Sequence, residues 1–232
     1  MAHSLKSNLD LVRSRVAGAA RRAGRSAEDL TLVAVTKSVE PDVAAELVRL
    51  GQVDLGENRA AELERKHEHL RGLGLAPRWH FVGHLQGNKV RRVVALADSI
   101  HSVDSLRLLE AIDRAAGDLG VAREVWIQAK LADEPTKSGL DPSELPAVIS
   151  RARELRNVRL AGLMALGPLA SDSRPVFREL ARLARELAPE AAMGDARGLG
   201  RMRTSMGMSG DFEAAIEEGS DVVRIGTLLF DD

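Results

Sequence analysis

Residues 30–38 read LTLVAVTKS and carry a lysine at the end of the first apolar run of the chain. Thr31, Val33 and Val35 are β-branched, and so short an apolar run is typical of a strand that is buried on both faces. We therefore expect a strand over this stretch. A charged side chain at its end is costly to bury unless it reaches solvent or takes part in chemistry. Lys37 is the first candidate for a reactive group.

Two interpretations of Lys37 are open at this point. A lysine that closes a strand can extend its ammonium group into solvent and have no further role. Alternatively, a lysine in a partly desolvated pocket loses proton affinity, and its neutral amine can form a Schiff base with an aldehyde such as pyridoxal phosphate. The remainder of the chain has to decide between them.

Short strands and amphipathic helices alternate along the whole sequence. We expect strands at residues 30–38, 53–58, 78–83, 99–104, 124–130, 158–166, 204–208 and 222–230. We expect helices near residues 5–24, 42–50, 59–71, 88–97, 106–119, 143–155, 176–187 and 211–218. Such alternation indicates parallel pairing, and about eight units of this total length favour a closed barrel.

The expected fold is therefore α/β: a single (β/α)8 TIM barrel over residues 1–232, with an extra N-terminal helix. No helix is expected after the eighth strand, and the N-terminal helix could fill that gap in the outer ring. A doubly wound open sheet is the alternative. A barrel would gather the polar residues that end its strands around one mouth. With Lys37, these residues are Asn58, His84, Asp104, Lys130 and either Arg224 or Thr227.

Composition narrows the class of ligand. The 232 residues are 44% hydrophobic, and 33 basic and 34 acidic residues give a net charge of -1, so no global field would attract nucleic acid or an anionic membrane. With 0 Cys, thiol catalysis and disulfides are excluded, and with 0 Tyr so is a phenol acid or base. No apolar stretch resembles a membrane helix or a signal peptide. We expect a cytoplasmic protein that binds a small molecule and holds no metal.

Two glycine-containing stretches fall in the last two barrel units, where barrels of this kind often bind phosphate. SMGMS spans residues 205–209 and precedes a helix, and RIGT spans residues 224–227. Backbone amides at such turns can cradle a phosphate, although each stretch alone is more often ordinary turn and cap chemistry. Their occurrence in this pair of loops indicates a phosphorylated ligand.

Eight short sequence motifs, occurring in a fixed order along the chain, identify a specific family resemblance. LVAVTKS, LGEN, WHFVGHLQGNK, IHSVD, EPTKSG, GLMAL, SMGMSGDFEAAI and VVRIGT occur from about residue 30 to residue 230. In this respect the chain resembles the pyridoxal-phosphate homeostasis proteins, which in turn resemble the N-terminal barrel of alanine racemase and are described as non-catalytic binders of the cofactor. The match departs at Arg59, where many relatives carry an aromatic residue.

The resemblance implies a role for each matching residue. Lys37 would hold pyridoxal 5'-phosphate (PLP) as an internal aldimine, with Asn58 beside the ring. Arg224 would face the pyridine nitrogen, and because an arginine does not readily give up its proton, the ring would be a poor electron sink. Four residues would bind the phosphate: Ser205, Gly207, Gly226 and Thr227.

Two functions follow from the resemblance. The first is a binder that buffers PLP, delivers it to apo-enzymes and so acts indirectly on amino-acid homeostasis. The second is a PLP-dependent amino-acid racemase. Racemisation needs an acid or base on each face of the substrate, and in alanine racemase the second group is a tyrosine from another domain. This chain offers no tyrosine, so we expect no catalytic residue and favour the binder, as a monomer. Lys137 is a possible second amine near the mouth.

Overall fold

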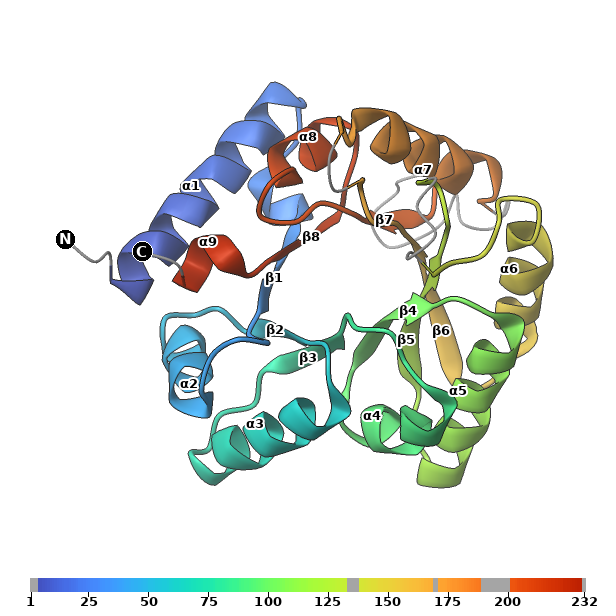
Figure 1. Cartoon of the computed structure of the whole chain (residues 1–232), viewed down its shortest axis with the longest axis horizontal. Coiled ribbons are helices and arrows are strands. Elements are labelled where there is room, and N and C mark those ends of the chain that lie inside the picture. Colours follow the sequence, from blue (N-terminus) through green and yellow to red (C-terminus); the bar gives the residue numbers. More distant parts are fainter. Residues whose placement is uncertain (1–3, 133–137, 169–170, 189–200, 231–232) are drawn as a thin grey trace.

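The computed structural model describes residues 4–132, 138–168, 171–188 and 201–230. Among these, eight parallel strands close into one barrel in sequence order, each paired with the next and β8 with β1 (Figure 1). The strands are β1 Thr31–Val35, β2 Asp54–Glu57, β3 Arg78–Phe81, β4 Ser99–Val103, β5 Arg123–Gln128, β6 Val158–Met164, β7 Arg203–Ser205 and β8 Val222–Ile225. The predicted (β/α)8 barrel is therefore confirmed, and the open sheet is excluded.

Helices form the outer ring (Figure 1). They are α1 Leu5–Arg22, α2 Pro41–Arg49, α3 Ala60–Gly72, α4 Val90–Leu96, α5 Leu106–Leu119, α6 Leu145–Glu154, α7 Arg174–Glu186, α8 Phe212–Glu217 and α9 Thr227–Phe230, with short 3-10 turns at Ala27–Asp29 and Gly87–Lys89. Helix α1 begins at the side chain of Ser4, which accepts a hydrogen bond from the amide of Ser7. It packs on both α8 and α9, so it covers the joint between the last barrel unit and the first.

Two predicted elements differ from the structure. Strand β1 ends at Val35, so Lys37 lies in the turn that follows rather than in the strand. The predicted eighth strand, 222–230, is a four-residue strand followed by helix α9. Apolar residues lie on both sides of Arg224, Gly226 and Thr227, which is why sequence pattern alone predicts one strand over the whole segment. The expectation that no helix follows the last strand was wrong.

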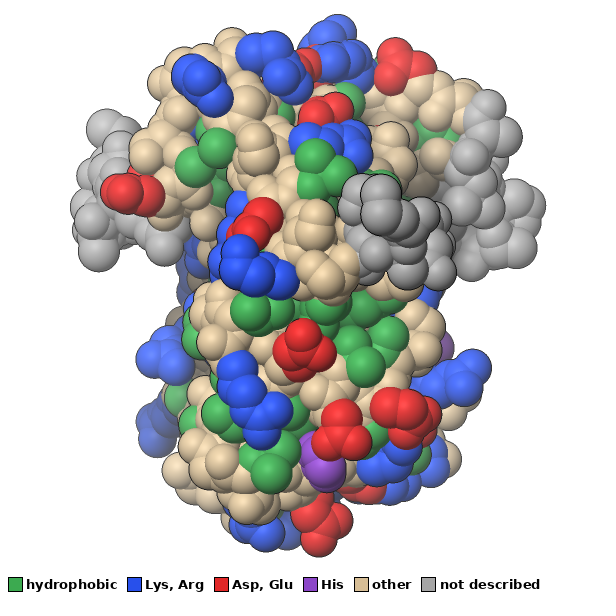
Figure 2. All heavy atoms as spheres, turned by 90° about the vertical axis from the view of Figure 1, so that its left-hand side faces the viewer, with side chains coloured by type: hydrophobic (Ala, Val, Ile, Leu, Met, Phe, Trp, Pro, Cys, Tyr) green, Lys and Arg blue, Asp and Glu red, His purple; other side chains and the backbone are tan. Residues whose placement is uncertain are grey.

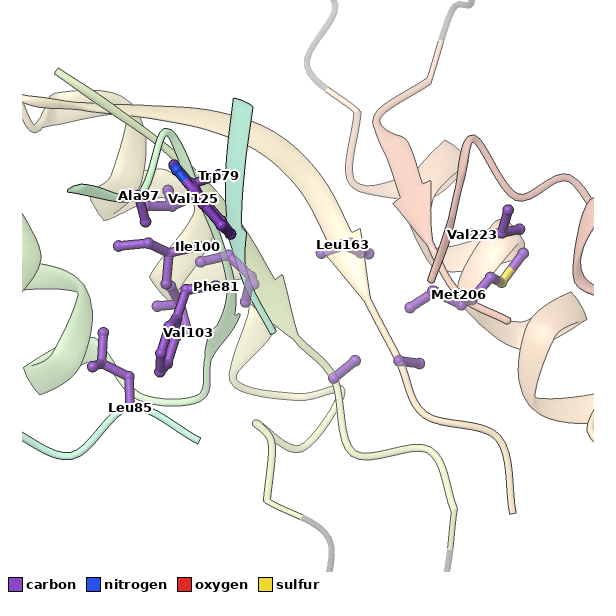
Figure 3. Packing of buried hydrophobic residues seen from close by; sticks show 14 of the residues in the cluster. Trp79, Phe81, Leu85, Ala97, Ile100, Val103, Val125, Leu163, Met206 and Val223 are labelled. Carbon is purple, nitrogen blue, oxygen red and sulfur yellow. The ribbon is translucent and has the colours of Figure 1, made fainter. Parts of the chain in front are cut away.

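Hydrophobic packing occurs in two layers. The larger cluster lies between the strands and the surrounding helices; Trp79, Phe81 and Ile100 are among its members (Figure 3). A smaller cluster fills the barrel interior: Val33, Val35, Trp126, Met164 and Val222. Much of the interior above and beside this cluster is polar, since buried His80, His101, Ser205 and Arg224 also lie there. A polar barrel interior is the feature on which the site is built.

Charges of both signs are mixed on one face of the molecule. On the face that carries α1 and α2, acidic and basic side chains are interspersed and apolar side chains are scattered (Figure 2). Within the described ranges, none of the helices has the length and apolar character required to cross a lipid bilayer.

Candidate functional site

Strand register brings Lys37, Asn58 and the loop after β8 together at the carboxyl-terminal mouth of the barrel. Val35 of β1 pairs with Gly56 of β2, so Lys37 and Asn58, each two residues further on, lie at the same level. On its other side β1 pairs with β8, with Ala34 opposite Ile225. Lys37 therefore lies between Asn58 and the loop that leaves β8. Its side chain is exposed, Asn58 is half-buried, and no described residue bonds the lysine amine.

The backbone under Lys37 is held rigidly by a buried ion pair. The ammonium of Lys66, on α3, lies 2.5 Å from the carboxylate of Glu57 and donates to the carbonyl oxygen of Thr36 at 2.5 Å. The hydroxyl of Thr36 donates to the same carboxylate oxygen at 2.6 Å, and its amide donates to Gly56 at 2.9 Å. Lys66 and Glu57 are fully buried. The reactive candidate is thus an exposed side chain on a fixed backbone.

The Asn58 loop is fixed by close backbone packing. A Cβ placed on Gly83 would lie 2.2 Å from the carbonyl oxygen of Asn58, so only glycine allows this approach. Beside Asn58 is a recess of about 310 Å³. Its lining includes the cations Arg59, Lys89 and Arg92, together with His84. His84 also lies 3.2 Å from Asp104, as expected for two residues of the same mouth. The recess gives this side of the mouth a basic rim.

The last two barrel loops converge on the β8 side of Lys37. The hydroxyl oxygen of Ser209 accepts hydrogen bonds from the amides of Gly226 at 3.3 Å and Leu228 at 3.5 Å. Gly207 has φ +93°, and a Cβ there would lie 2.5 Å from that of Ala215, so the turn requires glycine. The amide of Arg224 donates to the carbonyl of Gly207 at 3.0 Å, which ties the two loops together. Both amides donate to the Ser209 oxygen, so an anion at this place would meet the hydroxyl hydrogen of Ser209.

Ser209 is a residue that sequence reasoning missed, although it ends the SMGMS stretch. Ser205, predicted in its place, has its hydroxyl inside the barrel, where Arg224 donates to it at 2.5 Å and a ring nitrogen of His101 lies 2.9 Å away. That hydroxyl is fully buried and is not offered to a ligand at the loops. Thr227 is exposed at the start of α9. The structure thus brings Gly207, Gly226 and Thr227 to the loops and directs the Ser205 side chain elsewhere.

Arg224 is a buried cation at the floor of the mouth. It is 4% exposed, and its second nitrogen, Nη2, donates to the carbonyl of Ala165 at 3.2 Å. Burial lowers the pKa of Arg224 to about 10, while the charge of Asp211 acts in the opposite direction. Its two acceptors, the Ser205 hydroxyl and the Ala165 carbonyl, are neutral, and no described carboxylate forms an ion pair with it. A buried guanidinium in this state favours a further hydrogen-bond acceptor.

Metal binding finds no support among the described residues, where no group of three or more His, Asp or Glu side chains could hold an ion. Lys137, the possible second amine, lies outside the described residues. Lys130 is half-buried after β5, and its backbone amide bonds the carbonyl of Leu140.

Fold and site together define a parallel barrel with an amine, a buried guanidinium and an anion-suited pair of loops around one mouth. A family model described as the N-terminal domain of alanine racemase matches residues 5–232. The pyridoxal phosphate homeostasis proteins of Aquifex aeolicus and Escherichia coli K12 are each 39% identical over 225 residues, which is 96% of this chain and 95% and 94% of theirs. The chain belongs to the pyridoxal phosphate homeostasis protein family, within the alanine racemase N-terminal domain family.

Solved structures agree with this assignment. The PipY protein of Synechococcus elongatus with PLP bound superposes with a TM-score of 0.83 at 33% identity, covering 98% of this chain and 100% of PipY. Its structure without PLP gives a TM-score of 0.84 at 34% identity. Alanine racemase of Clostridium difficile 630 gives 0.69 at 19% identity over 97% of this chain but only 56% of the racemase. The racemase therefore shares the barrel fold, and this chain spans about half its length.

Proposed function

We propose that this protein binds PLP through Lys37 and acts in PLP homeostasis as a non-catalytic carrier that buffers the cofactor and delivers it to apo-enzymes. The observation that carries the proposal is the buried guanidinium of Arg224, placed without a carboxylate partner below a mouth whose rim holds Lys37. Its membership of the pyridoxal phosphate homeostasis family and the PLP-bound structure of PipY support the same ligand.

The residues at the mouth fit the three chemical parts of PLP. The amine of Lys37 is the attachment point for the aldehyde, and the preceding residue, Thr36, is fixed through its carbonyl by Lys66. Arg224 offers N–H donors to the ring nitrogen, and Asn58 flanks the ring. Ser209, whose oxygen accepts from the amides of Gly226 and Leu228, binds the phosphate through its hydroxyl hydrogen. Gly207 and Thr227 shape and border that loop pair.

PLP supplies an electrophilic aldehyde and a ring that can stabilise negative charge when its nitrogen is protonated. The residues of this chain limit that capacity. An arginine donates a hydrogen bond but keeps its proton, so Arg224 holds the ring nitrogen without protonating it. A site that grips the cofactor and weakens its electron sink is suited to storage and transfer rather than turnover.

The second candidate function is amino-acid racemisation, which the shared fold of alanine racemase suggests. It needs a second acid or base across the ring from Lys37, and the chain has 0 Tyr. Incubation of the PLP-loaded protein with enantiopure alanine tests it. Loss of optical purity faster than with free PLP would favour the enzyme, whereas equal rates are expected.

Spectrophotometric titration with PLP tests the carrier directly. We expect the wild-type protein to develop a saturable visible band, and a Lys37→Arg variant, which keeps the charge but not the nucleophile, to develop none. A second assay mixes loaded protein with an apo-transaminase and follows recovery of transaminase activity. Recovery no faster than with the same amount of free PLP would reject delivery, while leaving binding to be judged by the titration.

A further inference from the structure

Five side chains form one continuous hydrogen-bonded chain through the interior of the barrel. From the mouth downward, Arg224 Nη1 lies 2.5 Å from Ser205 Oγ, and Ser205 Oγ lies 2.9 Å from His101 Nδ1. His101 Nε2 then lies 2.9 Å from His80 Nδ1, and His80 Nε2 lies 2.8 Å from Asp54 Oδ1. The two rings are at most 1% exposed, while the Asp54 side chain is 22% exposed. The chain therefore runs from the buried floor of the mouth to the opposite, amino-terminal end of the barrel.

The two end residues, Arg224 and Asp54, determine which atom donates and which accepts in each hydrogen bond between them. Arg224 can only donate, and an ionised Asp54 can only accept. With Arg224 donating to Ser205, the serine hydrogen is free to bond Nδ1 of His101. His101 then donates from Nε2 to Nδ1 of His80, and His80 donates from Nε2 to Asp54. Every donor meets an acceptor only if both histidines are neutral and carry their proton on Nε2.

Ser99 gives independent support for that tautomer. Its hydroxyl donates to the carboxylate of Glu124 at 2.9 Å and accepts from Trp126 Nε1 at 2.9 Å. The same oxygen lies 3.3 Å from Nε2 of His101. Because the one hydrogen of Ser99 is committed to Glu124, the contact with His101 is favourable only if Nε2 of His101 is a donor.

Surrounding charges keep His101 neutral. Burial lowers the pKa of His101 well below its usual value, and His80 and three arginines lower it further. Those arginines come from β3, β7 and β8: Arg78, Arg203 and Arg224. The carboxylates facing the pair of rings are Asp54 directly and Glu124 through Ser99. His101 also stacks on Trp126, with ring centroids 5.1 Å apart. A neutral imidazole that stacks on Trp126 can accept a hydrogen bond at one nitrogen and donate one from the other, and it carries no charge.

We propose that His80, His101 and Ser205 are positioning residues, which transmit the anchoring effect of Asp54 through the barrel and hold Arg224 with its free N–H groups toward the mouth. The relay exists in the protein without ligand, and only its effect on PLP rests on the proposed function. Ser205 thus acts on the cofactor through Arg224 rather than by binding phosphate.

Histidine nitrogen NMR of the full-length protein without PLP tests the relay first. The chain has 6 His, and His80→Gln and His101→Asn variants assign the two buried signals. We expect a protonated Nε2 and an unprotonated Nδ1 for both rings at neutral pH. A proton on Nδ1 of His101 would overturn the proposal, whatever the result with PLP.

A matched pair of carboxamide variants tests transmission. Asp54→Asn removes the anchoring charge, and Glu217→Gln removes a carboxylate of the same exposure, 22%, on α8 in the outer ring, where it pairs with Arg22 and not with the relay. We expect Asp54→Asn to move the nitrogen resonances of both His80 and His101 and the pH midpoint of the visible PLP band, and Glu217→Gln to leave the tautomers and that midpoint unchanged. Equal responses in the two variants would contradict the relay. Should Asp54→Asn not fold, His80→Gln, which keeps a donor to Asp54 but offers no ring nitrogen to His101, must move the same midpoint.

Discussion

Among the described residues two Lys or Arg side chains are buried, Lys66 and Arg224, and their charges are compensated in opposite ways. Lys66, outside the barrel wall, is fully buried and meets the carboxylate of Glu57 and the carbonyl of Thr36. Arg224, inside the barrel, is 4% exposed and meets only a hydroxyl and a carbonyl. The charge of Lys66 is neutralised by a carboxylate of the protein, whereas the charge of Arg224 meets only neutral acceptors.

The difference separates a structural cation from a ligand-binding one. A compensated pair such as Lys66 and Glu57 contributes to the shape of the backbone under Lys37, and removing one member leaves an unpaired buried charge. An uncompensated guanidinium lowers stability until an acceptor arrives, so its burial is explained by binding. Substitution of Lys66 should therefore damage folding, and substitution of Arg224 should damage binding.

The largest effect is expected from Lys66→Met. The variant leaves the buried Glu57 carboxylate without its cation, which lowers the free energy of unfolding by about 3–5 kcal/mol. Denaturant titration measures it. The double variant Glu57→Leu with Lys66→Met should recover most of the loss, because no buried charge remains. Arg65→Met, at the exposed neighbouring position, should change little, and a loss there as large as at Lys66 would refute the contrast.

Arg224→Met should show the reverse pattern. Loss of a charged hydrogen-bond donor should weaken PLP binding by about 1.5–3 kcal/mol, roughly a ten- to hundredfold rise in Kd. The free energy of unfolding without PLP should stay the same or rise, because an uncompensated buried charge is removed. Paired titrations with PLP and with denaturant measure the two quantities. If the variant is less stable than the wild type yet binds PLP with unchanged affinity, Arg224 is a structural cation and not a ligand-binding one.

Gly207→Ala should strain the phosphate loop. At φ +93°, with the new Cβ 2.5 Å from that of Ala215, we expect a cost of about 1–3 kcal/mol, seen as lower stability and weaker PLP binding together. Gly210 in the same loop is the control, since a Cβ there meets nothing within 4 Å. Equal losses for Gly207→Ala and Gly210→Ala would show that the left-handed turn does not shape the site.

Ser209→Ala should have the smallest effect. One hydroxyl contact to phosphate contributes about 0.5–1.5 kcal/mol, so PLP binding should weaken by that amount. Binding of pyridoxal, which lacks the phosphate, should be unaffected, and the ratio of the two affinities is the measurement. If both ligands lose affinity equally, Ser209 acts on the shape of the loops and not on the phosphate.

Sequence pattern predicted the barrel because the alternation of strand and helix extends over the whole chain and each unit is locally distinct. It failed at residues 222–230, where apolar residues on both sides of Gly226 and Thr227 hide the change from β8 to α9. It predicted α3 as a helix, but it did not identify Lys66 as part of the buried face that Lys66 shares with Leu63 and Leu70.

The candidate site was predictable only in part. Strand ends located Lys37, Asn58 and Arg224, since a parallel barrel brings them to one mouth. Sequence could not tell that Ser205 points inward and Ser209 toward the amides of Gly226 and Leu228, because both serines lie in the same short stretch. That choice depends on how two loops pack against each other, which no local pattern contains.

Reductive trapping tests the central claim, that Lys37 is the amine which holds the cofactor. The PLP-loaded protein is reduced with borohydride, digested and mapped by mass spectrometry. The account predicts a pyridoxyl group on Lys37 at near-stoichiometric yield, and none at that yield on any other lysine of a Lys37→Ala variant. Label spread over surface lysines, or an undiminished label elsewhere in the variant, would contradict it.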